Sequence, residues 1–548
     1  MSRAHAMPIR SALLAVVLVL PALLAAQGQG RGAGMGRMGA AQDGNFLDSS
    51  ACALCHAAAP TAQALWSATG DDVSPYATWR GTMMANSFRD PYWRAQVAKE
   101  VSAAPPGQRA AIEGLCLRCH GPMAHHEARL AKEPAPGIAA AAQGRLAQDG
   151  VSCTVCHQVH AEKLGTSESF SGNLDIRPER RIYGPYPDPA FQPMRMHTGF
   201  LATHGPHVQR AALCGSCHTL FTTHVPGGKP FPEQTPYLEW RNSVFSDEGG
   251  AGPGTRTCQE CHMPDQGALR IARNPRGLDF NIKTRPQVRA HTFVGGNAWM
   301  LDLLRANREA LGVTAPAEAL ERNARATRRQ LAHDTATVAI EAVAREPGRL
   351  RFAVRVTNLT GHKFPTGYPA RRAWLRVQVR AGNRSLFVSG AADEQGRIAG
   401  VADERTLPHR DVIESATQVQ VYECVPADAG GRPTTFLTRM AAMGKDNRLL
   451  PRGWRGDAAD AAAILPVGVE GDADFRGGED VVRYAVPLPE DQGGSLTVVA
   501  TLLYQSVPPA WVEPLRAVDA EEARTFVRLY DASGKTPETV AVTVAIVE

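Results

Sequence analysis

Ten of the eleven cysteines of this 548-residue chain form five C-x-x-C-H motifs. Two thiols separated by two residues match the two vinyl groups of one haem, and the imidazole of the next residue then lies under the iron. Zinc would leave an odd number of cysteine pairs and five histidines without a role, and disulfide bonds would not require a histidine at one fixed position. The motifs therefore predict five covalently attached haem c groups. The predicted attachment residues are Cys52, Cys55, Cys116, Cys119, Cys153, Cys156, Cys214, Cys217, Cys258 and Cys261, and the predicted proximal iron ligands are His56, His120, His157, His218 and His262.

The second face of each iron needs its own ligand, and the identity of that ligand separates an electron carrier from a catalyst. A residue three to six positions after a proximal histidine lies on the near side of that haem, so His160 could serve only a neighbouring haem. We rank His207 and His291 highest as distal ligands, and we keep His160 and Met84 as candidates. The alternative for each of these histidines is a hydrogen-bonded histidine without a metal, and the alternative for Met84 is a core methionine. The other residues available in this region are His125, His126, His197, His204, His224 and Met83.

The N-terminus has the order of a secretory signal. Arg3 and Arg10 precede an apolar run from Ala12 to Ala26 that ends in small residues. This run is too short for a comfortable membrane span, so we expect a signal peptide over residues 1–26, with an uncleaved anchor as the alternative. Export would place the protein in the periplasm or elsewhere outside the cytoplasm. Removal of the two arginines lowers the formal net charge from +5 to +3, which is too weak a balance to indicate a nucleic-acid partner.

The region after the signal divides by composition. Residues 27–44 are rich in Gly, Ala and Gln, and we expect a flexible leader there. From 45 to 295 cysteine and histidine are dense and strand-like alternation is scarce, which favours short helices and loops around haem groups. Asp90 and Thr235 each precede a proline and predict helix starts. Two more helices are expected at about 297–311 and 316–333, in a helical connector at 296–334.

The hydrophobic period changes to two after the connector. Apolar residues alternate with Arg351 and Arg355 over 350–356 and with Arg376, Gln378 and Arg380 over 375–380. The pattern continues in 417–422, 481–486, 496–504 and 540–547. Six or more short strands over about 210 residues predict an antiparallel β-sandwich at 335–548. Cys424, the cysteine outside the motifs, is expected to be a small buried residue in this sandwich. The whole chain is therefore expected to be an α+β multidomain protein, with a mainly helical multihaem domain before the sandwich.

Several segments resemble one family. They are WRGTMMANSFRDPYW, CLRCHGPM, DGVSCTVCHQV, LCGSCHTLFT, FPEQTPYLEWRNS, TCQECHMP, HTFVGGNAWM and NLTGHKFPTGYPARRAWL. Over about residues 52–375 the chain is similar to the exported multihaem c-type cytochromes of the cytochrome c-554 (c-552/4) group. The resemblance implies haem-mediated electron transfer outside the cytoplasmic membrane, and relatives in the wider superfamily include enzymes that act on nitrogen compounds. The five motifs of this chain differ from the four of cytochrome c-554 and the eight of hydroxylamine oxidoreductase.

The resemblance extends through residues 358–367, which contain His362. Two glycines and Pro365 predict a tight loop in this segment rather than a continued strand. One interpretation is a turn whose histidine caps backbone groups. The other is a loop that folds back onto the haem domain, so that His362 approaches or ligates one haem.

The sequence favours a pentahaem cytochrome that relays electrons between redox partner proteins, through which it could join a membrane-associated complex. One alternative is a multihaem oxidoreductase acting on a small nitrogen compound, which requires a five-coordinate iron beside acid or base residues. Another is a haem-wired docking subunit of a larger redox complex. No G-x-S-x-G, P-loop or H-E-x-x-H motif indicates a different chemistry. We therefore expect an electron-transfer protein rather than a substrate-converting enzyme.

Overall fold

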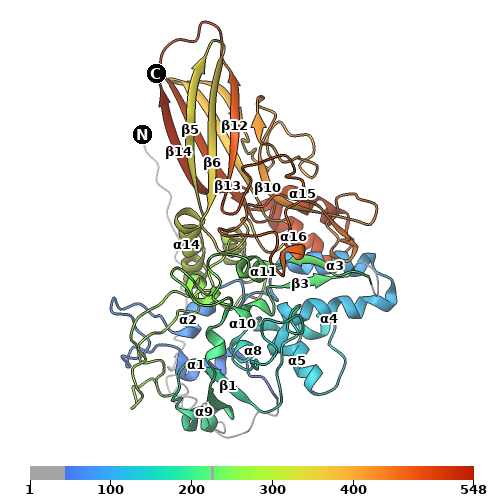
Figure 1. Ribbon diagram of the computed structural model, residues 1–548. Helices are drawn as coiled ribbons and strands as arrows, with labels where there is room; N and C mark the ends of the chain where they lie inside the picture. Colours follow the sequence, from blue (N-terminus) through green and yellow to red (C-terminus); the bar gives the residue numbers. More distant parts are fainter. Residues whose placement is uncertain (1–43, 224–227) are drawn as a thin grey trace, which may run out of the picture. The chain divides into compact units, whose positions relative to one another are not determined.

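The computed structural model describes residues 44–223 and 228–548. The expected signal peptide, the leader up to residue 43 and His224 lie outside these ranges. The described residues belong to one compact unit. Short helices dominate the first half of this unit, and strands dominate the second half (Figure 1). None of the helices described there is long and apolar enough to cross a membrane.

The part of the chain that carries the five motifs folds into short helices joined by loops. Its described strands form only two pairs, parallel β1–β2 and antiparallel β3–β4. The helices are α1 (Ser49–His56), α2 (Pro75–Trp79), α3 (Pro91–Ala103), α4 (Arg109–His120), α5 (Pro122–Leu130), α6 (Ile138–Ala141), α7 (Arg145–Gln148), α8 (Cys153–Cys156), α9 (Phe191–Thr198), α10 (Ala211–Gly215), α11 (Pro236–Arg241) and α12 (Cys258–His262). The strands are β1 (Arg181–Gly184), β2 (Leu201–His204), β3 (Leu220–Thr222) and β4 (Phe231–Gln234), and two 3₁₀ turns are η1 (Pro106–Gln108) and η2 (Pro206–Gln209).

The two predicted helix starts differ in their capping. Asp90 accepts hydrogen bonds from the backbone N–H groups of Tyr92 and Trp93, so the predicted cap of α3 is confirmed. α11 also begins at the predicted proline, but Thr235 makes no side-chain cap. Its hydroxyl instead donates to the buried carboxylate of Glu239, four residues later in the chain, at 3.4 Å.

Helices from three separate parts of the chain share one core. α13 (Ala298–Ala306) and α14 (Ala317–Asp334) pack together, and α16 (Glu521–Ala532) packs on α3. In this core the rings of Tyr92 and Phe526 lie 5.1 Å apart. α13 ends earlier than the sequence predicted, because the side chain of Asn307 donates to the Leu303 carbonyl oxygen at 2.8 Å.

The strands after α14 form two sheets. The order in one sheet is β11-β10-β7-β13-β14, with β8 also paired to β7, and the order in the other is β5-β6-β12-β9. All of these pairs are antiparallel except β12–β9, and the long strands lie side by side in Figure 1. The strands are β5 (Ala336–Glu346), β6 (Arg349–Asn358), β7 (Arg372–Ala381), β8 (Arg384–Ser389), β9 (Val412–Ile413), β10 (Val421–Ala427), β11 (Ala442–Asp446), β12 (Glu479–Pro487), β13 (Leu496–Gln505) and β14 (Glu538–Val547). The remaining short elements are η3 (Leu437–Arg439), η4 (Ala461–Ala463), α15 (Pro509–Val512) and η5 (Glu513–Ala517).

One hydrophobic core contains residues from both sheets. Phe352 of β6 stacks on Tyr484 of β12, and this core also contains Val377 of β7 and Val498 of β13. The expected strand at 417–422 was placed too early, since β10 starts at Val421 after a turn. The combination of helices and antiparallel sheets agrees with the expected α+β class. The division into a haem domain and a C-terminal sandwich stays a prediction.

Candidate functional site

The five motifs line one continuous cavity of about 1680 Å³. All ten motif cysteines and all five motif histidines contribute to its wall, which is mostly apolar. The cavity is larger than the range of about 300–1,000 Å³ that is typical for one small ligand. All eleven thiols are free, so the ten motif cysteines remain available for covalent attachment. The cavity therefore suits several large apolar groups rather than one.

Short helices position the side chains of each motif. The first, second and fifth motifs end α1, α4 and α12, the third motif forms α8, and the fourth overlaps the end of α10. Residues three and four positions apart lie on the same face of a helix. Both thiols of a motif and its histidine therefore point to the same side, which is the geometry that thioether attachment and axial ligation need.

Backbone carbonyl groups orient four of the five motif histidines. The bonds from Nδ1 are His56 to Ile271 at 2.8 Å, His120 to Ser87 at 3.2 Å, His157 to Tyr183 at 2.6 Å and His262 to Val294 at 2.5 Å. A carbonyl oxygen only accepts, so each Nδ1 carries the proton and the lone pair of Nε2 is free for iron. Burial lowers the pKa of all five rings, to about 4 for His120 and His218, so the rings are neutral at pH 7.

Two motif histidines face a second imidazole across the cavity. The ring centres of His157 and His291 are 6.2 Å apart with an interplanar angle of 26°, and those of His262 and His362 are 6.3 Å apart with an angle of 15°. His291 and His362 also direct Nδ1 to a carbonyl oxygen, at 3.1 and 3.0 Å. A metal bound to two imidazoles, with bonds of about 2 Å, holds the ring centres about 6 Å apart. Both pairs therefore have the spacing of two axial ligands.

The loop at 358–367 reaches the haem region. His362 lines the cavity, and the backbone N–H of the next residue, Lys363, donates to the carboxylate of Glu239 on α11. This placement favours the second interpretation of the loop, in which His362 approaches a haem. Ligation by His362 and by His291 stays a prediction.

The structure does not bring His160 and His207 to the cavity. The Nε2 atom of His207 lies 2.8 Å from the Val159 carbonyl oxygen, and Nδ1 of His160 lies 3.2 Å from the Tyr183 hydroxyl. Both rings pack edge-on against Tyr183. Ring nitrogens held in this way support structural roles, and the high rank of His207 as a distal ligand finds no support in the geometry.

Other candidates from the sequence are divided between the cavity and other sites. Met84 lines the cavity and keeps its place as a candidate ligand, and Met83 and His197 line it as well. His125 and His126 pack against each other on α5, away from the wall, and His204 is an exposed residue at the end of β2. His333, which no sequence motif singles out, also lines the cavity from the last turn of α14. Its position at the end of an amphipathic helix was the available signal.

Three arginines of the cavity wall could pair with the anionic propionate groups of haem c. Arg256, Arg371 and Arg439 line the cavity, and none of them forms an ion pair with a carboxylate among the residues that the structure describes. Arginine forms strong charge-assisted hydrogen bonds with carboxylates. These arginines, the free thiols and the oriented imidazoles together fit haem c.

Thiols of different motifs are in contact. Hydrogen bonds run from Cys52 to Cys153, from Cys217 to Cys119 and from Cys258 to Cys214, and each raises the pKa of the donor and lowers that of the acceptor. Burial and then the neighbouring Cys214 raise the pKa of Cys156 to about 12. The first motif is thus next to the third, the third to the fourth, the fourth to the fifth, and the second to the fourth.

A pocket of uncharged and acidic groups lies beside the second motif. Tyr92, Gln96 and Glu100 on α3 and Glu233 on β4 line the cavity near Cys116 and Cys119. The two amide atoms of Gln96 and Oε2 of Glu233 are buried without a well-formed hydrogen bond within the described chain. Burial, and then Glu100, raise the pKa of Glu233 to about 8. This carboxyl is therefore protonated at neutral pH and can donate a proton.

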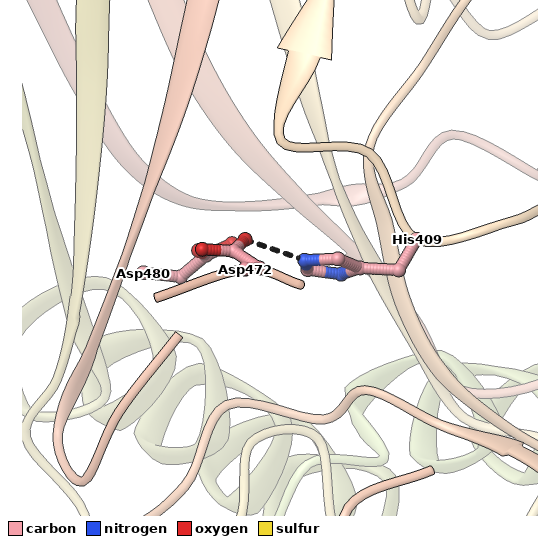
Figure 2. Close-up of side chains that lie close together, drawn as sticks. All are labelled: His409, Asp472 and Asp480. Atoms are coloured by element: carbon pink, nitrogen blue, oxygen red, sulfur yellow. Dashed lines mark hydrogen bonds and ion pairs between the residues drawn. The ribbon is translucent and has the colours of Figure 1, made fainter. Parts of the chain in front are cut away.

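A second cluster of ligand-type side chains lies beside β12, with Asp480 on the strand and His409 and Asp472 on loops (Figure 2). His409 Nε2 is 2.8 Å from Asp472, and Asp480 lies beside them. The Nδ1 atom faces the amide nitrogens of Gln420 at 2.7 Å and Asn447 at 3.0 Å. Each amide oxygen accepts a backbone N–H, so the NH₂ groups must face the ring. Nε2 therefore carries the proton and donates it to Asp472, which makes this cluster a hydrogen-bond network rather than a metal centre.

Comparisons with known proteins give one structural likeness. No protein-family model and no curated protein matches the chain. A solved structure, the penta-heme cytochrome c552 from Thermochromatium tepidum, is similar at 18% identity and a TM-score of 0.49. The match covers 92% of this chain and 99% of that chain.

Proposed function

We propose that the chain is an exported pentahaem c-type cytochrome that relays electrons between redox partner proteins. The observation that carries the proposal is the single cavity into which all five complete motifs point. When bound, each haem would take up and release one electron at its iron. The chain supplies the attachment thiols, the axial imidazoles and the low-polarity surroundings that determine the potentials.

The thiol contacts imply an order for the relay. The first, third, fourth and fifth motifs form a continuous series, and the second motif joins it at the fourth. The histidines agree with this order. Burial is the main cause that lowers the pKa of His56 and of His120, and the nearby His157 and His218 add a smaller lowering to the first and the second of these rings. Attachment sites in contact keep adjacent haem edges close, which shortens each electron step.

The proposed distal ligands are His291 for the third motif and His362 for the fifth. Two imidazoles saturate an iron and leave no position for a substrate, which favours electron transfer at these two haems. Export is proposed from the basic, apolar and small-residue order of residues 1–26. Fractionation of cells that express the full chain checks this part of the proposal.

Two histidine variants test the relay. His291→Ala and His362→Ala should each retain five haem additions in the intact mass, while one iron becomes high-spin and the reduced protein binds one more CO. His160→Ala is the matched control, because it removes a buried histidine outside the cavity and should leave the spectrum unchanged. Fewer than five haem additions in the wild type, or unchanged spectra in both cavity variants, would overturn the proposal.

The pocket beside the second motif favours a second candidate function, reduction or oxidation of a small nitrogen compound. In the described residues His120 stacks on Trp93 at 4.5 Å and has no ring contact with a second histidine of the cavity. The protonated Glu233 could supply a proton to a ligand bound there. A high-spin signal in the wild type, together with turnover of hydroxylamine or nitrite that falls in Glu233→Gln, would support this function. A wholly low-spin protein without turnover would exclude it.

A further inference from the structure

A buried network of four charged side chains joins α11 to the loop that carries His362. Glu239 belongs to α11, Lys363 to the loop and Asp446 to β11, and Arg448 follows that strand. The exposed fractions of these side chains are 0, 0, 2 and 7%. Lys363 Nζ lies 2.6 Å from Asp446, and Arg448 lies 2.7 Å from Asp446 and 3.3 Å from Glu239. The two negative charges of the carboxylates and the two positive charges of Lys363 and Arg448 therefore balance one another out of contact with solvent.

Within this network, Glu239 holds the loop directly after His362. Its Oε2 atom accepts hydrogen bonds from the backbone N–H of Lys363 at 3.1 Å and from the hydroxyl of Thr366. The carbonyl oxygen of the same peptide unit, that of His362, accepts a hydrogen bond from the side-chain amide of Asn358 at 2.9 Å. The peptide unit directly after the residue whose ring faces His262 is thus held at both its N–H group and its carbonyl oxygen.

Close packing makes the position of the loop specific. A Cβ atom added at Gly361 would lie 3.0 Å from the Trp240 ring and 3.3 Å from the Phe245 ring. Trp240 is the residue next to Glu239 on α11 and is itself buried. The loop therefore approaches α11 as closely as a residue without a side chain allows, and a small displacement of the backbone would move His362.

We propose that Glu239 is a positioning residue that keeps His362 opposite His262 and so determines whether the iron at the fifth motif has two imidazole ligands. This inference rests on the proposed function, because it takes His362 as the distal ligand. In this proposal the C-terminal sheets also support the redox site, because Asp446 pairs with Lys363 and Arg448 pairs with Glu239. A network with a purely structural role would leave the coordination of the iron unchanged when it is weakened.

Three variants of the holoprotein test the inference. Glu239→Ala and the more conservative Thr366→Val should both keep five haem additions. In a fraction of the molecules one iron should become high-spin, and CO uptake should rise by up to one molecule per protein. The change should be larger in Glu239→Ala, because Thr366→Val removes only one of the two contacts and leaves no charge unpaired. Added imidazole should restore the low-spin spectrum in both. Glu423→Gln is the control, because it breaks another buried pair of the sheets, with Lys445 at 3.0 Å, without touching the loop.

His362→Ala, measured in parallel, separates the assignment of His362 as a ligand from the positioning role of Glu239. If His362→Ala makes one haem high-spin but Glu239→Ala and Thr366→Val keep the wild-type spectrum, the positioning role is wrong and the proposed function stands. If His362→Ala itself leaves the spectrum unchanged, the ligand assignment is wrong, and the positioning role fails with it. A spectral change in Glu423→Gln equal to that in Thr366→Val would also overturn the specific role of Glu239.

Discussion

Glu233 allows a quantitative test of the pocket beside the second motif. Its side chain is 3% exposed, and burial followed by Glu100 raises its pKa from 4.5 to about 8. An acid whose pKa is raised by folding binds its proton more tightly in the folded state than in the unfolded chain. Below pH 4.5 Glu233 is protonated in both the folded and the unfolded chain, and its contribution to stability is fully present. As the pH rises from 4.5 through 8, the unfolded chain releases this proton first, and the folded state loses stability.

The size of this loss follows from the two pKa values. At about 1.36 kcal/mol per pKa unit, ionising Glu233 in the folded protein costs about 5 kcal/mol. About 2 kcal/mol of this cost is present at pH 6, and nearly all of it is present at pH 9. The wild type should therefore lose about 3 kcal/mol more stability between pH 6 and pH 9 than Glu233→Gln, which has no proton to release.

Urea unfolding of the holoprotein, followed by far-ultraviolet circular dichroism at both pH values, measures this difference. Glu113→Gln is the control, because it removes a half-buried carboxylate from α4 near the same motif and leaves Glu233 in place. The same pH dependence in the wild type and in Glu233→Gln would refute the reasoning. Glu233 would then be ionised at neutral pH, and the small-molecule function would lose its proton donor.

Two further outcomes are expected. Replacing Cys153 and Cys156 by serine should reduce the intact mass by one haem and leave four, and a protein that still carries five would contradict the attachment sites. Lys363→Met should lower the free energy of unfolding in urea by about 3 kcal/mol or more, because it removes one partner of a fully buried pair. Lys283→Met, which breaks an exposed pair with Asp188, should cost at most about 1 kcal/mol, and equal losses in the two variants would contradict the argument.

Local sequence was sufficient wherever the determining residues are neighbours in the chain. A C-x-x-C-H motif places two thiols and an imidazole on one face of a helical turn, whatever the rest of the chain does. The cap of α3 follows from Asp90 and the proline after it, and β6 follows from a hydrophobic period of two. The limits of elements were less predictable, since Asn307 ends α13 through a side-chain bond that the apolar pattern does not contain.

The sequence by itself determined which residues could hold haem, whereas only the tertiary structure decided what lies opposite each of them. His207 and His291 ranked equally, yet the fold turns His207 toward a backbone carbonyl and sets His291 across from His157. The sequence around Glu239 gives no sign of its role, because the loop that packs on it lies more than 100 positions later in the chain. No spacing rule connects the two sides of a cavity, because they come from distant segments, and only the packing of those segments brings them together.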